Sequence, residues 1–192
     1  MSPRIIGRRM SMGLLIKNGT IVSAIDEFEG DILVEGEKIS QVGVNLPEEG
    51  HEVIDARGKF VFPGGVDEHV HMGSFATLSF ETSHAAVVGG TTTIVDFPPQ
   101  LKGKGIIDSV NEQNEKCAAG VSTADYSFHG MVMDTSEKLL EEIPKMAEAG
   151  ITTLKFFMAY KYTPFMVQDD LIFKSMQIAK DYGITIMVHA EN

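Results

Sequence analysis

Short apolar stretches separated by polar turns dominate residues 13–60 of the chain. Val and Ile recur in runs of a few residues, with glycines between many of them, which is typical of β-strands joined by tight turns. Asn18 and Gly19 indicate a hairpin between the first two runs. The predicted strands cover 14–17, 20–23, 30–36, 38–43, 52–55 and 59–62. Several strands at this close spacing predict a small β-sandwich or sheet.

After residue 63 the pattern changes to nearly continuous apolar runs that alternate with segments of helical periodicity. Pro144 lies inside the third helical segment and predicts a kink or a break there. Strand–helix repeats with such apolar strands predict an α/β fold, in which helices lie outside a parallel sheet. Strands are predicted over 62–71, 91–97, 124–129, 152–159 and 184–189, and helices over 80–88, 107–119, 136–149 and 169–182.

The number of repeats indicates part of a larger fold. A (β/α)₈ TIM barrel needs eight strand–helix repeats and about 250 residues, whereas about five strands are predicted here. An open half-barrel would expose a strand edge and half of a core, so we expect this chain to be the N-terminal part of a longer protein. The alternative is a complete small α/β protein with an open sheet. The predicted organisation is an N-terminal extension over 1–12, half of a β-sandwich over 13–61 and a truncated barrel over 62–192.

Two histidines stand at the end of the first apolar run of the predicted barrel. Side chains alternate between the two faces of a strand, so His69 and His71 share one face. Two imidazoles so placed can chelate a metal ion such as zinc. The alternative is a structural or incidental pair.

Lys155 lies inside a predicted apolar strand, where an ammonium ion is costly and burial lowers the lysine pKa. A neutral amine there is nucleophilic and can react with carbon dioxide to give a carbamate, which has two oxygens and can bridge two cations. The alternatives are a lysine that snorkels from the strand end and a buried ion pair.

His189 ends the last predicted strand, where a hydrogen-bonded core histidine is the alternative to a ligand. Side chains at the C-terminal ends of different barrel strands converge on one mouth. The candidates that follow this rule are His69, His71, Lys155 and His189.

Composition narrows the classes of partner. The net charge of −11 and the pI of about 4.9 argue against nucleic acid. Cys117 is the single cysteine, expected as a small apolar helix residue, and it fits a reducing cytoplasm. The sequence contains no run of about 18 apolar residues, so no transmembrane helix is expected. Arg8 and Arg9 lack the long apolar segment of a twin-arginine signal, so no signal peptide is expected.

Five pieces of the sequence carry a resemblance that spans nearly the whole chain. They are Phe62–His71, Gly89–Phe97, Asp125–Gly130, Leu154–Lys161 and Val188–Asn192. With these pieces in this order, the chain resembles the cyclic amidohydrolases, and most closely the dihydropyrimidinase/hydantoinase group. The resemblance implies a metal-dependent (β/α)₈ barrel with a β-sandwich built from both chain ends. It also implies a homotetramer that opens cyclic amides, dihydropyrimidines or 5-substituted hydantoins, to N-carbamoyl amino acids.

The resemblance also implies roles for individual residues. Two divalent metal ions, usually Zn²⁺, would be held by His69 and His71 on one side and His189 on the other. The N6-carboxylated Lys155 would bridge them, and a hydroxide between the metals would attack the ring carbonyl. Tyr160 would donate a hydrogen bond to the substrate carbonyl as it becomes an oxyanion, with core packing as its alternative. Phe157, together with Phe165, would line the substrate pocket or serve packing.

Several features leave alternatives open. The family carries a further histidine and an aspartate on later strands, so we expect the site of this fragment alone to be incomplete. Residues 72–81 look shorter than the corresponding hydantoinase loop, which leaves substrate preference open. An allantoinase-type enzyme and a non-catalytic assembly-type homologue are the competing functions. Asp67, Asp96 and His129 stand between a supporting role in the site and a purely structural one.

Overall fold

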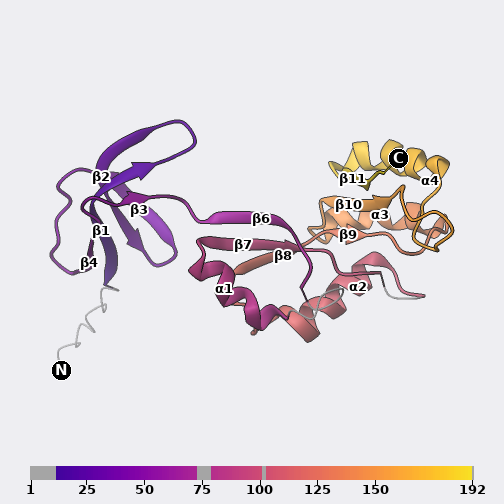
Figure 1. The fold of residues 1–192 in the computed structure, drawn as a ribbon, viewed down its shortest axis with the longest axis horizontal. Helices are drawn as coiled ribbons and strands as arrows, with labels where there is room; N and C mark the ends of the chain where they lie inside the picture. The colour runs from indigo at the N-terminus through magenta and orange to yellow at the C-terminus, as the bar shows by residue number, and fades with distance from the viewer. Residues whose placement is uncertain (1–11, 73–78, 101–102, 192) are drawn as a thin grey trace, which may run out of the picture. The chain divides into compact units, whose positions relative to one another are not determined.

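The computed structural model describes residues 12–72, 79–100 and 103–191, with the side chains of 116 and 117 left out. The chain divides into two compact units, over 1–63 and 64–192 (Figure 1). Nearly all of the predicted extension, most of the segment after the histidine pair and the side chain of Cys117 lie outside the described residues. Among the helices that the structure describes, none is long and apolar enough to cross a membrane.

The first unit is a sheet in which the strand order is β3-β2-β1-β4, with β5 paired to β1. β1 is antiparallel to β2 and parallel to β4 and β5. The strands are β1 (Gly13–Val22), β2 (Glu27–Glu35), β3 (Lys38–Gly43), β4 (His51–Asp55) and β5 (Phe60–Val61).

The predicted hairpin at Asn18 and Gly19 is wrong, because β1 continues through both residues as one strand. The register with β2 shifts between Ile16 and Gly19, which marks a β-bulge. Asn18 takes the left-handed backbone conformation with φ of 61°. Its N–H donates to the buried Asp31 carboxylate at 2.9 Å. This contact with the neighbouring strand β2 satisfies the Asn18 N–H where the β1–β2 ladder is interrupted.

The second unit contains two three-stranded parallel sheets of order β6-β7-β8 and β11-β10-β9 (Figure 1). The chain passes from one sheet to the other at His129, whose N–H donates to Asp96 O at 2.9 Å. Val132 N then donates to Lys155 O at 3.0 Å, which extends the second ladder. The strands are β6 (Gly65–Val70), β7 (Thr91–Asp96), β8 (Asp125–Phe128), β9 (Gly130–Met131), β10 (Thr153–Phe157) and β11 (Thr185–His189).

Helices follow the strands of this unit at the predicted places. α3 continues through Pro144, so the predicted break is absent. A turn of π-helix, Asn114–Ala118, directly follows α2. The helices are α1 (Ser83–Val88), preceded by a 3₁₀ turn Phe80–Thr82, α2 (Ile106–Gln113), α3 (Lys138–Glu148), and α4 (Asp169–Ala179), followed by a 3₁₀ turn Lys180–Tyr182.

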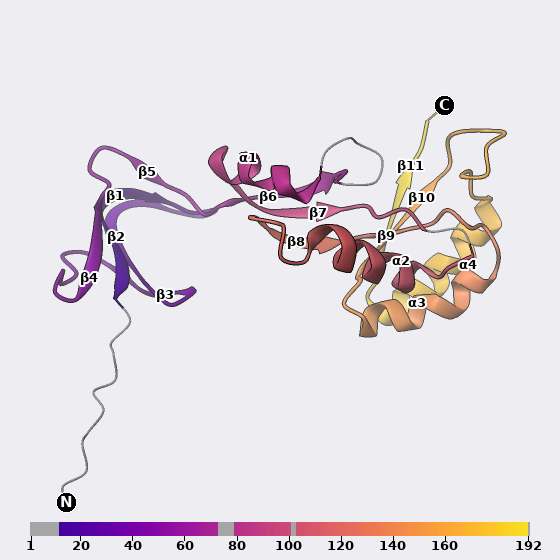
Figure 2. The same cartoon turned by 90° about the horizontal axis from the view of Figure 1, so that it is seen from below.

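The main core of the second unit lies between its helices and strands. Figure 2 shows α2, α3 and α4 on one side of strands β9 to β11. Ile143 and Met146 of α3 and Leu154 and Phe156 of β10 are all fully buried in this cluster. The packing of amphipathic helices on apolar strands therefore fixes the sheet of β9, β10 and β11. The candidate site described below lies at the ends of strands in this unit.

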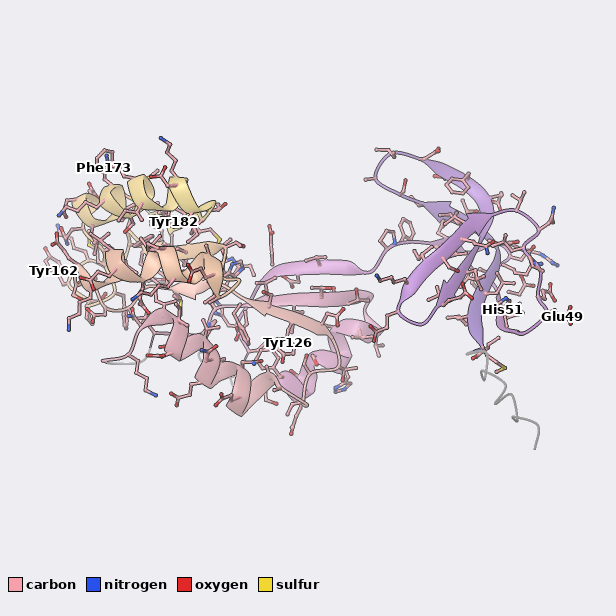
Figure 3. The ribbon with its side chains drawn as sticks, turned by 180° about the vertical axis from the view of Figure 1, so that it is seen from behind. Glu49, His51, Tyr126, Tyr162, Phe173 and Tyr182 are labelled. Carbon is pink, nitrogen blue, oxygen red and sulfur yellow. The ribbon has the colours of Figure 1, made fainter. Side chains whose placement is uncertain are left out.

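Leu154→Ala tests this core. We expect the substitution to lower the free energy of unfolding by about 2–5 kcal/mol, because it removes a fully buried side chain from a packed cluster. Chemical denaturation of the full-length gene product measures the change. Phe173→Ala is the control, because Phe173 projects from α4 with 61% of its surface exposed (Figure 3), and we expect a change within about 0.5 kcal/mol. Equal effects of the two substitutions would contradict this account of the core.

Candidate functional site

A cavity of about 450 Å³ lies in the second unit beside the C-terminal ends of its strands. Parallel pairing aligns Phe157 of β10 with His189 of β11, and His71 directly follows β6. All six predicted site residues line this cavity: His69, His71, Lys155, Phe157, Tyr160 and His189. Its remaining walls come from Phe97, Met131, Met133, Thr163 and Phe165. The structure thus brings together side chains from three strand ends that are far apart in the sequence.

Phe97 forms the floor on the side of the histidine pair. Its ring is almost completely buried, and its centroid lies 4.6 Å from that of His69 and 5.4 Å from that of His71. The two imidazole centroids are 5.5 Å apart. Lys155 Nζ lies 5.8 Å from the centroid of the same Phe97 ring. The Phe97 ring therefore contacts both imidazoles and lies next to the Lys155 amine.

Phe157 plays the matching part on the opposite side of Lys155. The lysine Nζ lies 5.6 Å from the Phe157 centroid. The His189 ring lies 6.1 Å from Phe157 and 5.3 Å from Tyr160, between centroids. Lys155 consequently lies between the histidine pair on one side and His189 on the other.

Lys155 is 8% exposed, and burial lowers the pKa of its amine. The described residues supply no carboxylate that would raise this pKa again, so the ion-pair alternative is not seen in them. The pKa of His71 is also lowered, first by burial and then by the neighbouring His69. Both shifts favour the neutral forms, and a neutral imidazole is the form that binds a metal.

Tyr160 occupies a strained position in the loop after β10. Its φ of 65° is in the left-handed region, which costs free energy for a residue with a side chain. Its carbonyl accepts hydrogen bonds from Thr163 N at 3.0 Å and from Thr163 Oγ1 at 2.6 Å. Val167 N closes the loop by donating to Phe157 O at 2.8 Å. These contacts hold the Tyr160 ring against His189.

The three residues left between two roles are resolved by their contacts. Asp67 accepts a hydrogen bond from His69 N at 3.1 Å, so it supports the backbone of the pair. His129 is buried, stacks on Phe97 and bonds to Glu68 O at 2.8 Å, which is a structural role behind the cavity. Asp96 is fully buried at the end of β7, and burial raises the pKa of its carboxyl.

Sequence reasoning did not single out Phe97, Met131, Met133, Thr163 or Gln113. The two methionines line the cavity from the end of β9 and the residues after it, and apolar side chains there look like core residues in a sequence. Gln113 ends α2, where its side chain makes contacts behind the cavity. The sequence indicates only that Gln113 belongs to a helix. A polar residue on a helix usually faces water, so nothing in the pattern pointed to a role in the site.

The side chains at the cavity that could donate to a metal ion are imidazoles from two separate parts of the chain. Among the described residues, no three His, Cys, Asp or Glu side chains are close enough together to hold a metal ion. A carboxylated Lys155 would add two oxygen donors between His69 and His71 on one side and His189 on the other. His189 Nε2 also contacts the Glu191 carboxylate at 2.5 Å, so a metal ion would compete with that pair.

The chain is similar in sequence and in structure to proteins that carry names. The chain is 45% identical over 188 residues to a D-hydantoinase of Geobacillus stearothermophilus, covering 94% of this chain and 40% of that protein. It is 37% identical over 187 residues to a dihydropyrimidinase of Dictyostelium discoideum, covering 93% and 37% of the two. The crystal structure of a dihydropyrimidinase from Brevibacillus agri matches with a TM-score of 0.87 at 41% identity, covering 94% of this chain and 40% of that one.

The chain therefore spans only 37–40% of the length of these two curated relatives. Its mixed α/β fold matches that of a hydantoinase-type structure over the shared part. The sequence model of the amidohydrolase family matches residues 60–192, which include every residue lining the cavity. On this evidence the chain belongs to the amidohydrolase family.

Proposed function

We propose that this chain carries part of the active site of a metal-dependent hydrolase that opens cyclic amides. The observation that carries the proposal is the gathering of His69, His71, Lys155 and His189 around one cavity beside Tyr160. Similarity to proteins named D-hydantoinase and dihydropyrimidinase supports dihydropyrimidines or 5-substituted hydantoins as substrates and N-carbamoyl amino acids as products.

The proposed architecture follows from the same relatives. Residues 62–192 would form about the first five strands of a (β/α)₈ barrel, with β8 and β9, which only His129 separates, counted as one. Residues 13–61 would form part of a β-sandwich. The alternation of parallel strands and helices in the second unit supports this assignment. A homotetramer in the cytoplasm, acting on a small-molecule substrate, completes the proposal.

The metal centre is proposed on the fit of the donors. His69 and His71 would hold one divalent ion and His189 the other, with N6-carboxylated Lys155 between them. Bound there, two zinc ions would lower the pKa of water and polarise the amide carbonyl of the substrate. A neutral Lys155 amine, favoured by its burial, is the form that combines with carbon dioxide.

The remaining work belongs to the side chains of the cavity wall. Phe97, Phe157 and Met131 present apolar surface around Lys155, which excludes water and strengthens electrostatic interactions inside. The Tyr160 hydroxyl would donate a hydrogen bond to the carbonyl oxygen of the substrate as negative charge develops there. The loop contacts of Thr163 hold Tyr160 in place before the substrate arrives.

Two other functions compete with this one. A non-catalytic assembly-type homologue has no need of metal ligands, whereas this chain keeps each proposed ligand at the cavity. An allantoinase-type enzyme would use the same metal centre with a different ring. Measured metal content distinguishes the assembly-type homologue from the proposed enzyme. Activity on a panel of dihydrouracil, hydantoins and allantoin distinguishes the allantoinase-type enzyme from it.

Lys155→Ala tests the metal centre. We expect the full-length gene product, purified without chelator, to hold about two zinc ions per chain. Intact mass should show carboxylation, and both signals should be lost on Lys155→Ala because no group remains between the histidines. Lys161→Ala is the matched control, since Lys161 lies outside the cavity lining and its Nζ is 5.2 Å from the Tyr162 ring. A folded protein without bound metal would support the assembly-type alternative instead.

Tyr160→Phe tests the oxyanion contact. We expect kcat for the preferred cyclic amide to fall by about 10²–10³-fold with little change in KM, because the lost donor acts mainly in the transition state. Tyr162→Phe is the control, since Tyr162 is 93% exposed and also takes the left-handed conformation (Figure 3). Steady-state kinetics of both variants decide the matter. Equal kcat in the two would show that the Tyr160 hydroxyl has no role in the reaction.

A further inference from the structure

A buried polar cluster lies directly behind the histidine pair and is not part of the cavity lining. Its centre is the Asp96 carboxylate at the end of β7, which is fully buried. Asp96 Oδ1 accepts a hydrogen bond from Met72 N at 2.8 Å. Asp96 thus binds the residue that follows His71, and it directly precedes Phe97, whose ring contacts both imidazoles.

Gln113 completes the cluster from the end of α2. Its Nε2 donates to Met72 O at 2.9 Å and to Asp96 Oδ2 at 3.3 Å. The π-helical turn begins at the next residue, Asn114. Asn114 Oδ1 accepts a hydrogen bond from the hydroxyl of Tyr126 on β8 at 2.8 Å. The end of α2 is therefore fixed against the strands, and Gln113 has a defined position.

The backbone of Met72 depends on these side chains for its hydrogen bonds. The β6–β7 ladder ends at the pairing of Val70 with Asp96. Beyond that point, the N–H and C=O of Met72 are satisfied by Asp96 and Gln113, since a buried backbone group without a partner is costly. His71 lies between the end of the ladder and this pair of contacts, so its backbone is held on both sides.

Asp96 is not placed to bind a metal ion itself. Its carboxylate is fully buried, is already bonded to Met72 and Gln113, and is absent from the cavity wall. Gln113 is likewise absent from the wall. Both residues can act on the site only through the groups that they hold.

We propose that Asp96 and Gln113 are positioning residues that fix the backbone at Met72 and so aim His71 into the cavity. The inference rests on the proposed function, because His71 matters there as a metal ligand. Residues that orient metal ligands typically contribute about 10- to 100-fold to metal affinity. The cluster would therefore set how tightly the metal is retained.

The experiment compares zinc retention against a competing chelator in the full-length gene product and two variants. Gln113→Met keeps a similar side-chain volume and removes both donated hydrogen bonds. Asp96→Asn keeps the shape of the side chain and places an amide N–H₂ opposite the N–H₂ of Gln113, so two donors face each other. We expect zinc affinity to fall by about 10- to 100-fold in each variant. Gln113 is only half-buried, so its variant keeps the test valid if Asp96→Asn does not fold.

Ser83→Ala is the matched control for the loss of a buried hydrogen bond. Ser83 is fully buried in α1, and its hydroxyl accepts from Thr123 N at 2.8 Å, away from the cavity lining. We expect this variant to lose stability and to retain zinc as the unchanged protein does. Folded Gln113→Met protein with the zinc affinity of the control would overturn the inference. Unchanged protein without bound zinc would overturn the proposed function, and the inference with it.

Discussion

The burial of Lys155 is the constraint on which the site depends. Its amine is 8% exposed and lies between the rings of Phe97 and Phe157. Two cation–π contacts stabilise an ammonium ion by about 1–4 kcal/mol together, whereas removing the ion from water costs several kcal/mol even after relaxation. No carboxylate among the described residues offsets that cost, and burial lowers the pKa of the amine. A strand that holds such a lysine is poorly explained by stability alone, and uptake of carbon dioxide in the proposed function gives the buried position a chemical use.

The same two rings explain why the surrounding groups converge. Parallel register places Phe157 beside His189, and β7 leads directly into Phe97, beneath the histidine pair. Each ring contacts imidazoles on one side and borders Lys155 on the other. Helices packed on the far side of the sheet keep those strands in register, because Leu154 and Phe156 are buried in the core while Lys155 between them faces the cavity. The alternation of side chains along β10 thus separates core from chemistry at neighbouring residues.

Much of this could be predicted from the sequence, and the failures have a common cause. Apolar runs and turn residues located the strands, and the rule that barrel ligands lie at strand ends selected His69, His71, Lys155 and His189. The hairpin at Asn18 was wrong because Asp31, distant in sequence, supplies a hydrogen bond that local turn chemistry does not consider. Gln113 was missed for the same reason: its partners are Met72 and Asp96, and only the folded chain brings them together.

Local sequence patterns therefore predict helices, strands and strand ends. The residues that hold the site in place are found by asking which group pairs with each backbone N–H and C=O near it. Both places where the chain leaves a strand at the cavity show this. After β6 the peptide groups of Met72 are satisfied by Asp96 and Gln113. After β10 the carbonyl of the left-handed Tyr160 is satisfied by Thr163. The hydrogen bonds between paired strands hold only regular backbone. A side chain that must point into a cavity from the end of a strand needs an irregular backbone conformation there. Side chains that replace the ladder at those exits make the irregular conformation stable. The geometry of the site therefore depends on the hydrogen bonds of Asp96 and Gln113 outside the cavity lining, and of Thr163 within it.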